Sequence, residues 1–175
     1  MKKIILIVTL LPAFILSCGK NNNTTGKSPV INGHLNRAWL KSIEKESDST
    51  YHKPYFRRDF VTAWYFLNKK TNSVCQEMRD SSDNVRQVII AINNIRTYFA
   101  QYYPDGQVMS TANVDSSGKF SGEAVNYFPS GNIKSKGTYK NGLYNGIWET
   151  YDESGRLLFQ EEYDSNGAVK NTIRY

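Results

Sequence analysis

One phrase of the sequence occurs three times at nearly constant spacing, and this repetition restricts the possible folds more than any other feature. The copies are Tyr102–Gly106, Tyr127–Gly131 and Tyr151–Gly155, which begin 25 and then 24 residues apart. An aliphatic residue follows each glycine by two positions, and a further glycine comes later in each copy. A tandem repeat of this length indicates stacked copies of one unit, because a unit so short cannot bury its own apolar face.

The residues within each copy predict two strands and two tight turns. Pro104 and Pro129 fix φ at about −65° at the second turn position. Glycine occupies the fourth position, where a type I turn closed by a bulge residue needs positive φ. Lys140–Gly142 is predicted to make the opposite turn by the same chemistry. The glycines that we assign to turns are Gly106, Gly131, Gly142, Gly146 and Gly155.

Alternation along the strands predicts which side chains share a face of the sheet, provided that the register is kept. Tyrosine and β-branched residues in neighbouring strands stabilise a sheet by about 0.2–1 kcal/mol per pair. The residues predicted to share one face are Tyr102, Val108, Val114, Tyr127, Ile133, Tyr139, Tyr151, Leu157 and Tyr163.

The segment before the repeats predicts further hairpins and one helix. Residues 60–94 alternate between apolar and polar residues, and Asn93 and Asn94 suit a hairpin turn with positive φ. Consecutive strands joined by such short loops are antiparallel neighbours. Leu35, Trp39, Leu40 and Ile43 have the spacing of a short helix. The predicted fold is therefore mainly β: an elongated antiparallel β-meander of repeats of about 24 residues, with a short N-terminal helix.

The sequence from Gly137 to Gly155, GTYKNGLYNGIWETYDESG, resembles the MORN-repeat variant found in the YwqK-type antitoxin family. The resemblance covers residues 95–175. The earlier copies depart from the pattern, because Phe99 and Ala124 stand where a later copy has Trp148. The resemblance implies a sheet of MORN-like repeats, and it also implies that the chain is an antitoxin or immunity protein that neutralises a cognate toxin.

The N-terminus has the layout of an export signal. Lys2 and Lys3 precede an apolar stretch at residues 4–16, which is shorter than a membrane-spanning helix. Ile15–Cys18 resembles a bacterial lipobox, which implies that Cys18 is acylated and becomes the first residue of the mature protein. A plain signal peptide with an incidental cysteine and a true membrane span are the alternatives.

These patterns divide the chain into five segments. They are a lipoprotein signal peptide (1–17), a flexible tether (18–33), a helix with a polar linker (34–59), degenerate β-hairpins (60–94) and a MORN-like repeat sheet (95–175). We expect a lipid-anchored protein of the bacterial cell envelope, at the outer membrane. The formal net charge of +6 falls to about +4 without Lys2 and Lys3. Export excludes nucleic acid as a partner.

No motif for catalysis, metal binding or cofactor binding is found in the sequence. Cys75 lies in an alternating stretch and is predicted to be a small apolar residue of a strand. The loops that begin at Asp115, Asp152 and Asp164 could be read as calcium loops, but they lack the later oxygen ligands, and turn formation explains them. We therefore expect no catalytic residue, no metal and no cofactor. The predicted function is a non-catalytic binding or scaffolding module displayed at the membrane surface, with the antitoxin role as the first alternative and an enzyme of unrecognised site as the second.

Aromatic side chains are the best candidates for a recognition surface, because rows of rings on a sheet suit sugar rings or the apolar patch of a partner protein. The alternative is that these rings pack within the fold. The expected partners are membrane lipid through Cys18, an unknown protein, and possible glycan. The candidate binding residues are Tyr102, Tyr103, Tyr127, Tyr144, Trp148 and Tyr151.

Overall fold

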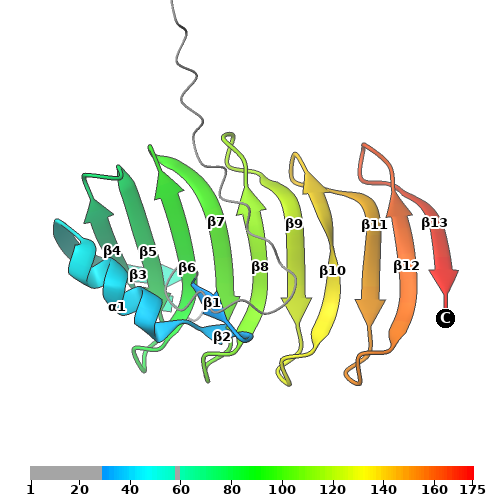
Figure 1. The fold of residues 1–175 in the computed structure, drawn as a ribbon, viewed down its shortest axis with the longest axis horizontal. Helices are drawn as coiled ribbons and strands as arrows, with labels where there is room; N and C mark the ends of the chain where they lie inside the picture. Colours follow the sequence, from blue (N-terminus) through cyan, green and yellow to red (C-terminus); the bar gives the residue numbers. More distant parts are fainter. Residues whose placement is uncertain (1–28, 58–59) are drawn as a thin grey trace, which may run out of the picture.

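A single large sheet dominates the structure. The computed structural model describes residues 29–57 and 60–175. Eleven strands, β3 to β13, pair in the order of the chain, and every neighbouring pair is antiparallel (Figure 1). This arrangement confirms the predicted β-meander.

The helix and strands have the following bounds. The N-terminal elements are β1 (Val30–Ile31), β2 (His34–Leu35) and α1 (Arg37–Glu46). The strands before the repeats are β3 (Ser49–Arg57), β4 (Phe60–Asn68), β5 (Ser73–Arg79) and β6 (Val85–Ile92). The remaining strands are β7 (Ile95–Tyr102), β8 (Val108–Val114), β9 (Phe120–Tyr127), β10 (Ile133–Lys140), β11 (Leu143–Tyr151), β12 (Leu157–Tyr163) and β13 (Val169–Arg174).

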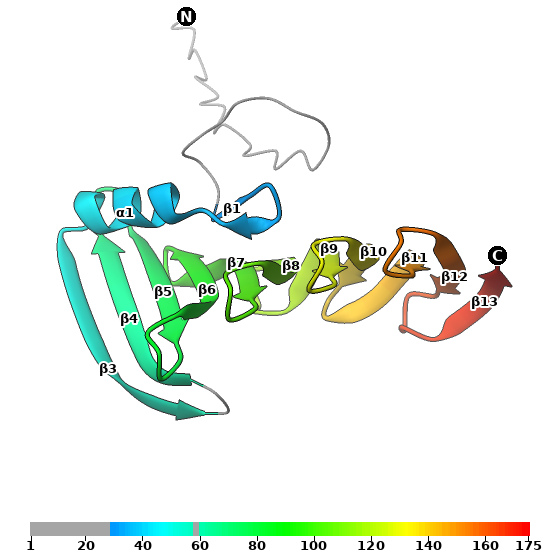
Figure 2. The same ribbon diagram turned by 90° about the horizontal axis from the view of Figure 1, so that it is seen from below.

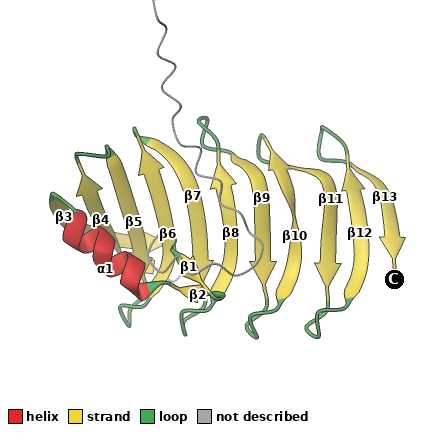
Figure 3. Ribbon diagram, viewed as in Figure 1, coloured by secondary structure: helices red, strands yellow, loops and turns green. Residues whose placement is uncertain are grey.

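Tight turns join consecutive strands at both ends of the strands (Figure 3). The asparagine pair between β6 and β7 has φ of 52° and 63°, and the turn glycines Gly106, Gly131, Gly142 and Gly155 have φ between 84° and 89°. Gly146, which the sequence assigned to a turn, lies instead within β11, where its φ of 67° accompanies a register shift in the pairing with β10. The aspartate that opens an acidic turn accepts hydrogen bonds from backbone N–H groups further along that turn. Asp152 does so from Ser154 and Arg156, both at 3.0 Å, and Asp115 and Asp164 do the same in their turns. These aspartates therefore stabilise the turns in which they lie.

The helix covers one face of the sheet near its N-terminal end. Asn36 caps α1 by accepting a hydrogen bond from the Trp39 backbone N–H at 3.0 Å. Trp39 is buried, and it packs with side chains of β4 to β8 in the main core. We call the side of the sheet that contacts this core the helix face. Its buried residues are Leu35, Trp39, Phe66, Cys75, Val85, Val88, Ala100, Tyr102 and Val108.

The sheet bends where the strands before the repeats meet the repeats. Figure 2 shows that β3, β4 and β5 run at a steep angle to the later strands, turning away from the side on which α1 lies. From β9 to β13 the described part of the chain forms a single layer (Figure 2). Two layers are thus present only at the N-terminal end of the sheet.

A β-bulge follows the turn in each repeat, and it changes which side chains share a face. Tyr127 pairs with Ile133, whereas the preceding residue of β9, Asn126, pairs with Ser135, so Lys134 is an extra residue. Equivalent register shifts follow the turns at the starts of β8 and β12. An extra residue reverses the alternation of the strand beyond it. Tyr139 and Tyr163 therefore lie on the face opposite the tyrosines with which the sequence grouped them.

The structure differs from the sequence prediction at three further places. The end of the predicted flexible tether (18–33) contains β1, which pairs with β2. Leu35, predicted to lie on the helix, belongs to β2, because the helix begins at Arg37. The polar linker predicted at the end of residues 34–59 is the strand β3, which pairs with β4 from Ser49 to Arg57. Its composition misled the prediction, because most of its side chains are exposed at the edge of the sheet. The signal peptide and Cys18 lie outside the described residues. Within those residues, no helix is long and apolar enough to span a membrane.

A candidate binding surface opposite the helix

Six aromatic rings form a continuous row on the face of the sheet opposite the helix face. Phe99 stands between Tyr98 and Ala100 of the core, and its partners across successive strands are Ala112, Ala124 and Gly137, which defines this opposite face. We call the six rings the aromatic row. In order they are Phe99, Phe120, Tyr139, Trp148, Tyr144 and Tyr163, with ring centroids of neighbours 4.4–5.7 Å apart.

The row comes from three positions of the repeat. Phe120 and Tyr144 occupy one position, Tyr139 and Tyr163 a second, each pair separated by 24 residues. Phe99 and Trp148 occupy the third position, where the intermediate copy has an alanine. The bulges place all three positions on the same face, so the repeat period aligns the rings across the strands.

Trp148 is the best packed ring of the row. Its exposed fraction is 5%, and its indole Nε1–H donates to the backbone carbonyl of Thr138 at 3.0 Å. The indole lies directly over Gly137, where a Cβ would be 2.3 Å from its Cδ2 atom. Phe120 and Tyr144, by contrast, are 37% and 41% exposed. The row therefore has a fixed centre and accessible rings beside it.

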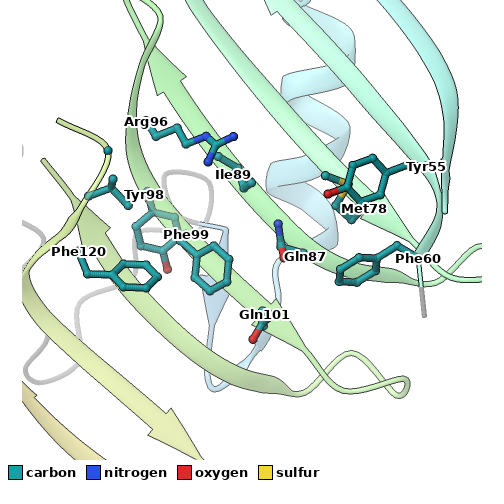
Figure 4. Close-up of a pocket in the computed structure, with 12 residues that line it drawn as sticks. Tyr55, Phe60, Met78, Gln87, Ile89, Arg96, Tyr98, Phe99, Gln101 and Phe120 are labelled. Carbon is teal, nitrogen blue, oxygen red and sulfur yellow. The ribbon is translucent and has the colours of Figure 1, made fainter. Parts of the chain in front are cut away.

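A hollow of about 350 Å³ adjoins the row at the bend of the sheet. Figure 4 shows Tyr55 and Phe60 on one side of it, Phe99 and Phe120 on the other, and two glutamine side chains between them. Phe99 and Phe120 belong both to the hollow and to the row. The two features therefore form one continuous surface.

The structure brings together only two of the six predicted binding residues. Tyr144 and Trp148 lie in the aromatic row. Tyr102 is 1% exposed in the core, and its hydroxyl donates to the Pro29 carbonyl at 3.1 Å. Such a side chain has no surface to offer a partner, so the structure removes Tyr102 from the candidate surface.

The other three predicted tyrosines make contacts within the fold. The Tyr103 hydroxyl donates to the Tyr127 carbonyl at 3.0 Å, and the Tyr127 ring packs against the main core. Tyr151 lies on the helix face, where its hydroxyl donates to Glu149 at 2.6 Å.

Sequence reasoning missed four members of the row. Phe99, Phe120, Tyr139 and Tyr163 were not among the candidates, although the second position of the row repeats visibly as Tyr139 and Tyr163. Counting one extra residue after each turn would have placed these tyrosines beside Trp148. The missing step was thus the bulge, which the glycine at the fourth turn position already suggested.

Buried ionisable groups near the helix have structural partners. Burial raises the pKa of Glu77, although Arg79 counteracts this effect through a hydrogen bond and a salt bridge at 2.8 Å. The Arg79 guanidinium lies 5.0 Å from the centre of the Trp64 ring. Burial also raises the pKa of the Cys75 thiol, which is 4% exposed. These groups serve the core rather than an open site.

Two pairs of carboxylates are also occupied. Glu161 and Glu162 lie on opposite faces, where they accept hydrogen bonds from the Tyr163 hydroxyl and the Lys170 ammonium. Asp80 caps its own turn and Asp83 pairs with Arg79. Within residues 29–57 and 60–175, no three His, Cys, Asp or Glu side chains are placed to hold a metal ion.

Comparison with known proteins agrees with the geometry of the repeats. Residues 120–141 and 144–165 match the family model of the MORN repeat variant. These two segments are similar to MORN-variant repeats. The first matched repeat coincides with β9 and β10, and the second with β11 and β12. Five of the six rings of the aromatic row lie in these two matched segments, and Phe99 precedes them.

More distant comparisons add no functional argument. No curated protein matches the chain. Two similar solved structures are accessory secretory protein 1, 2 and 3 of Streptococcus pneumoniae (TM-score 0.35, 11% identity) and TarM (TM-score 0.36, 13% identity). The matches cover 74% and 62% of this chain but only 23% and 24% of those chains. The chain thus spans about a quarter of the length of these structures.

Proposed function

We propose that this protein is a non-catalytic binding module, held at the surface of the bacterial envelope by a lipid on Cys18. Its binding surface is the aromatic row together with the adjoining hollow. The observation that supports this function is the continuity of six rings on the face opposite the helix. Aromatic rings that expose one face and fix the other within a sheet give large contact areas at little entropic cost.

The pattern of burial supports the assignment of this face. The helix face is covered by α1 at its N-terminal end, where its large side chains are buried. On the opposite face, Phe120 and Tyr144 keep more than a third of their surface exposed beside buried Trp148. Exposed aromatic side chains that are held in place by neighbours are typical of protein and glycan interfaces.

The test is capture of partners from native membranes by the full-length protein and its variants. Tyr144→Ser removes an accessible ring of the row, and Tyr175→Ser removes an exposed tyrosine outside it. We expect Tyr144→Ser to lose bound components that the wild type and Tyr175→Ser retain. Equal capture by all three proteins would refute the row as the binding surface. Stoichiometric capture of one protein, encoded nearby and toxic without its partner, would indicate immunity.

The lipid anchor has a separate test. We expect the wild type to incorporate a radiolabelled fatty acid and to fractionate with membranes, and Cys18→Ala to do neither. Membrane association of an unlabelled Cys18→Ala protein would contradict the anchor and leave the binding surface unaffected.

A further inference from the structure

We propose that the hollow at the bend of the sheet binds an oligosaccharide that carries carboxylate groups. This inference rests on the proposed function, since it names a ligand for the same face of the sheet. It is carried by the described side chains that line the hollow, which combine aromatic walls, an amide floor and the positive charge of Arg96. Its volume of about 350 Å³ falls at the small end of the range of ligand sites, about 300–1,000 Å³.

The aromatic walls come from strands that are far apart in the chain. Tyr55 and Phe60 belong to the hairpin of β3 and β4, and the bend of the sheet places them opposite Phe99 and Phe120 (Figure 4). A pyranose ring has two C–H faces that pack on aromatic rings and a rim of hydroxyl groups. The walls therefore suit the faces of a sugar ring.

The floor of the hollow suits the hydroxyl rim. Gln87 and Gln101 are direct partners across β6 and β7, so their amides lie side by side (Figure 4). Each amide offers one acceptor oxygen and two N–H donors. The Ser110 hydroxyl donates a hydrogen bond to the side-chain oxygen of Gln101 at 3.4 Å. The Gln87 amide has no side-chain partner within the described residues. A ligand surface without hydrogen-bonding groups would bury these amides unsatisfied, at a cost that the hydroxyl groups of a sugar avoid.

The charge of the hollow favours an acidic sugar. Arg96 is the one charged residue of the lining, and no Asp or Glu contributes to it within the described part of the chain. Arg96 is exposed, and it makes no ion pair with any described residue. A guanidinium binds a carboxylate through two parallel hydrogen bonds. A ligand with carboxylates is therefore preferred over a neutral or cationic one.

The aromatic row gives a longer ligand a path out of the hollow. Phe120 lies at the boundary of the hollow, and the Tyr139 ring packs beside it at an interplanar angle of 37°, with ring centroids 5.5 Å apart. An oligosaccharide that is anchored by its acid group beside Arg96 can thus extend across Phe120 toward Tyr144. Rings placed in this way contact successive sugars rather than a single one.

The experiment is calorimetric titration of the full-length protein in detergent with defined oligosaccharides. The probes are oligogalacturonate and sialyllactose as acidic ligands, cellohexaose as the neutral ligand, chitosan hexamer as the cationic ligand, and an extended apolar peptide. We expect an acidic oligosaccharide to bind and the neutral and cationic ones to bind at least about tenfold more weakly. If neither acidic probe binds, or if the neutral one binds equally well, the proposal is wrong. Preferential binding of the peptide would also overturn it.

Matched variants locate the ligand. We expect Arg96→Gln to weaken acidic binding by about tenfold and to abolish its salt dependence, whereas Arg174→Gln, with the same charge change on β13, leaves it unchanged. Gln87→Ala should weaken binding by a similar factor, with Gln160→Ala as its control. Thermal melts of each variant identify losses caused by misfolding. Unchanged binding by folded Arg96→Gln and Gln87→Ala proteins would refute the hollow as the oligosaccharide-binding site.

The two proposals fail in different ways. If capture of partners from membranes depends on Tyr144 but no acidic oligosaccharide binds, the proposed function as a binding module is supported and only the proposed ligand is wrong. If an acidic oligosaccharide binds through Arg96 while capture is independent of Tyr144, the hollow stands and the row is not part of the binding surface.

Discussion

The contact between Gly137 and Trp148 gives the sharpest test of how the repeat sheet is built. Alanine at position 137 would place a Cβ 2.3 Å from Trp148 Cδ2 and 2.5 Å from both Cγ and Cε2. These atoms belong to the fixed part of the indole, which Tyr144 and the Thr138 carbonyl hold in place. The indole must therefore move, with loss of its hydrogen bond.

The expected cost follows from these two losses. Overpacking in a well-packed region costs about 1–3 kcal/mol. A lost hydrogen bond adds about 0.5–1.5 kcal/mol. We expect Gly137→Ala to lower the free energy of unfolding by about 2–4 kcal/mol, measured by urea denaturation followed by far-ultraviolet circular dichroism.

A double-mutant cycle separates this clash from other effects of alanine. Trp148→Ala alone should cost about 3–5 kcal/mol. The backbone at position 137 does not have positive φ, so alanine is tolerated there once the indole is gone. Alanine in a strand interior is more stable than glycine by about 0.5–1 kcal/mol. Gly137→Ala should therefore stabilise the Trp148→Ala protein. An equal cost in both backgrounds would refute the reasoning.

Three further predictions concern other parts of the fold. Hydrogen bonds from Ser154 and then Arg156 lower the pKa of Asp152 from 3.8 to about 2, so the stability that Asp152 provides is present above pH 3.8 and is lost as the pH falls toward about 2. Melting temperatures of Asp152→Asn should decline less across that window than those of the wild type. Because Cys75 is buried, its thiol in the Cys18→Ala protein should react with a thiol reagent only on unfolding. Rapid labelling of the folded protein would contradict the burial of Cys75. Tyr102→Phe should lower the free energy of unfolding by about 0.5–1.5 kcal/mol in urea, because the buried Pro29 carbonyl loses one of two donors and keeps only the Asn36 backbone N–H.

The sequence predicted the strands well because their signals are local. Asn93 and Asn94 mark a hairpin without reference to the rest of the chain, and the glycine at the fourth turn position does the same in each repeat. β3 was missed because an exposed edge strand has little apolar alternation, and it contains Pro54, a residue that strands tolerate mainly at a sheet edge. Its identity depends on pairing with β4, which composition does not encode.

The binding surface was harder to predict than the fold. It depends on which face of the sheet each side chain lies on, and on how the sheet bends. One bulge residue per repeat decides on which face Tyr139 lies, and a single error reverses every later side chain of the strand. Tyr102 was grouped correctly with the other turn tyrosines, but its burial depends on the helix and on β1, which lie far away in sequence. Neither effect can be read from the period of the repeat.

The hollow and the aromatic row therefore have different origins within the same sheet. The row is a property of the repeats, because a fixed bulge and a fixed period place the same three positions on one face in each copy. The hollow requires in addition the bend that carries Tyr55 and Phe60, which belong to β3 and β4 and lie outside the repeats. A chain with more repeats would lengthen the row without altering the hollow. The length of ligand contacted can thus change with repeat number, whereas the chemistry at the anchored end depends on the strands that precede the repeats.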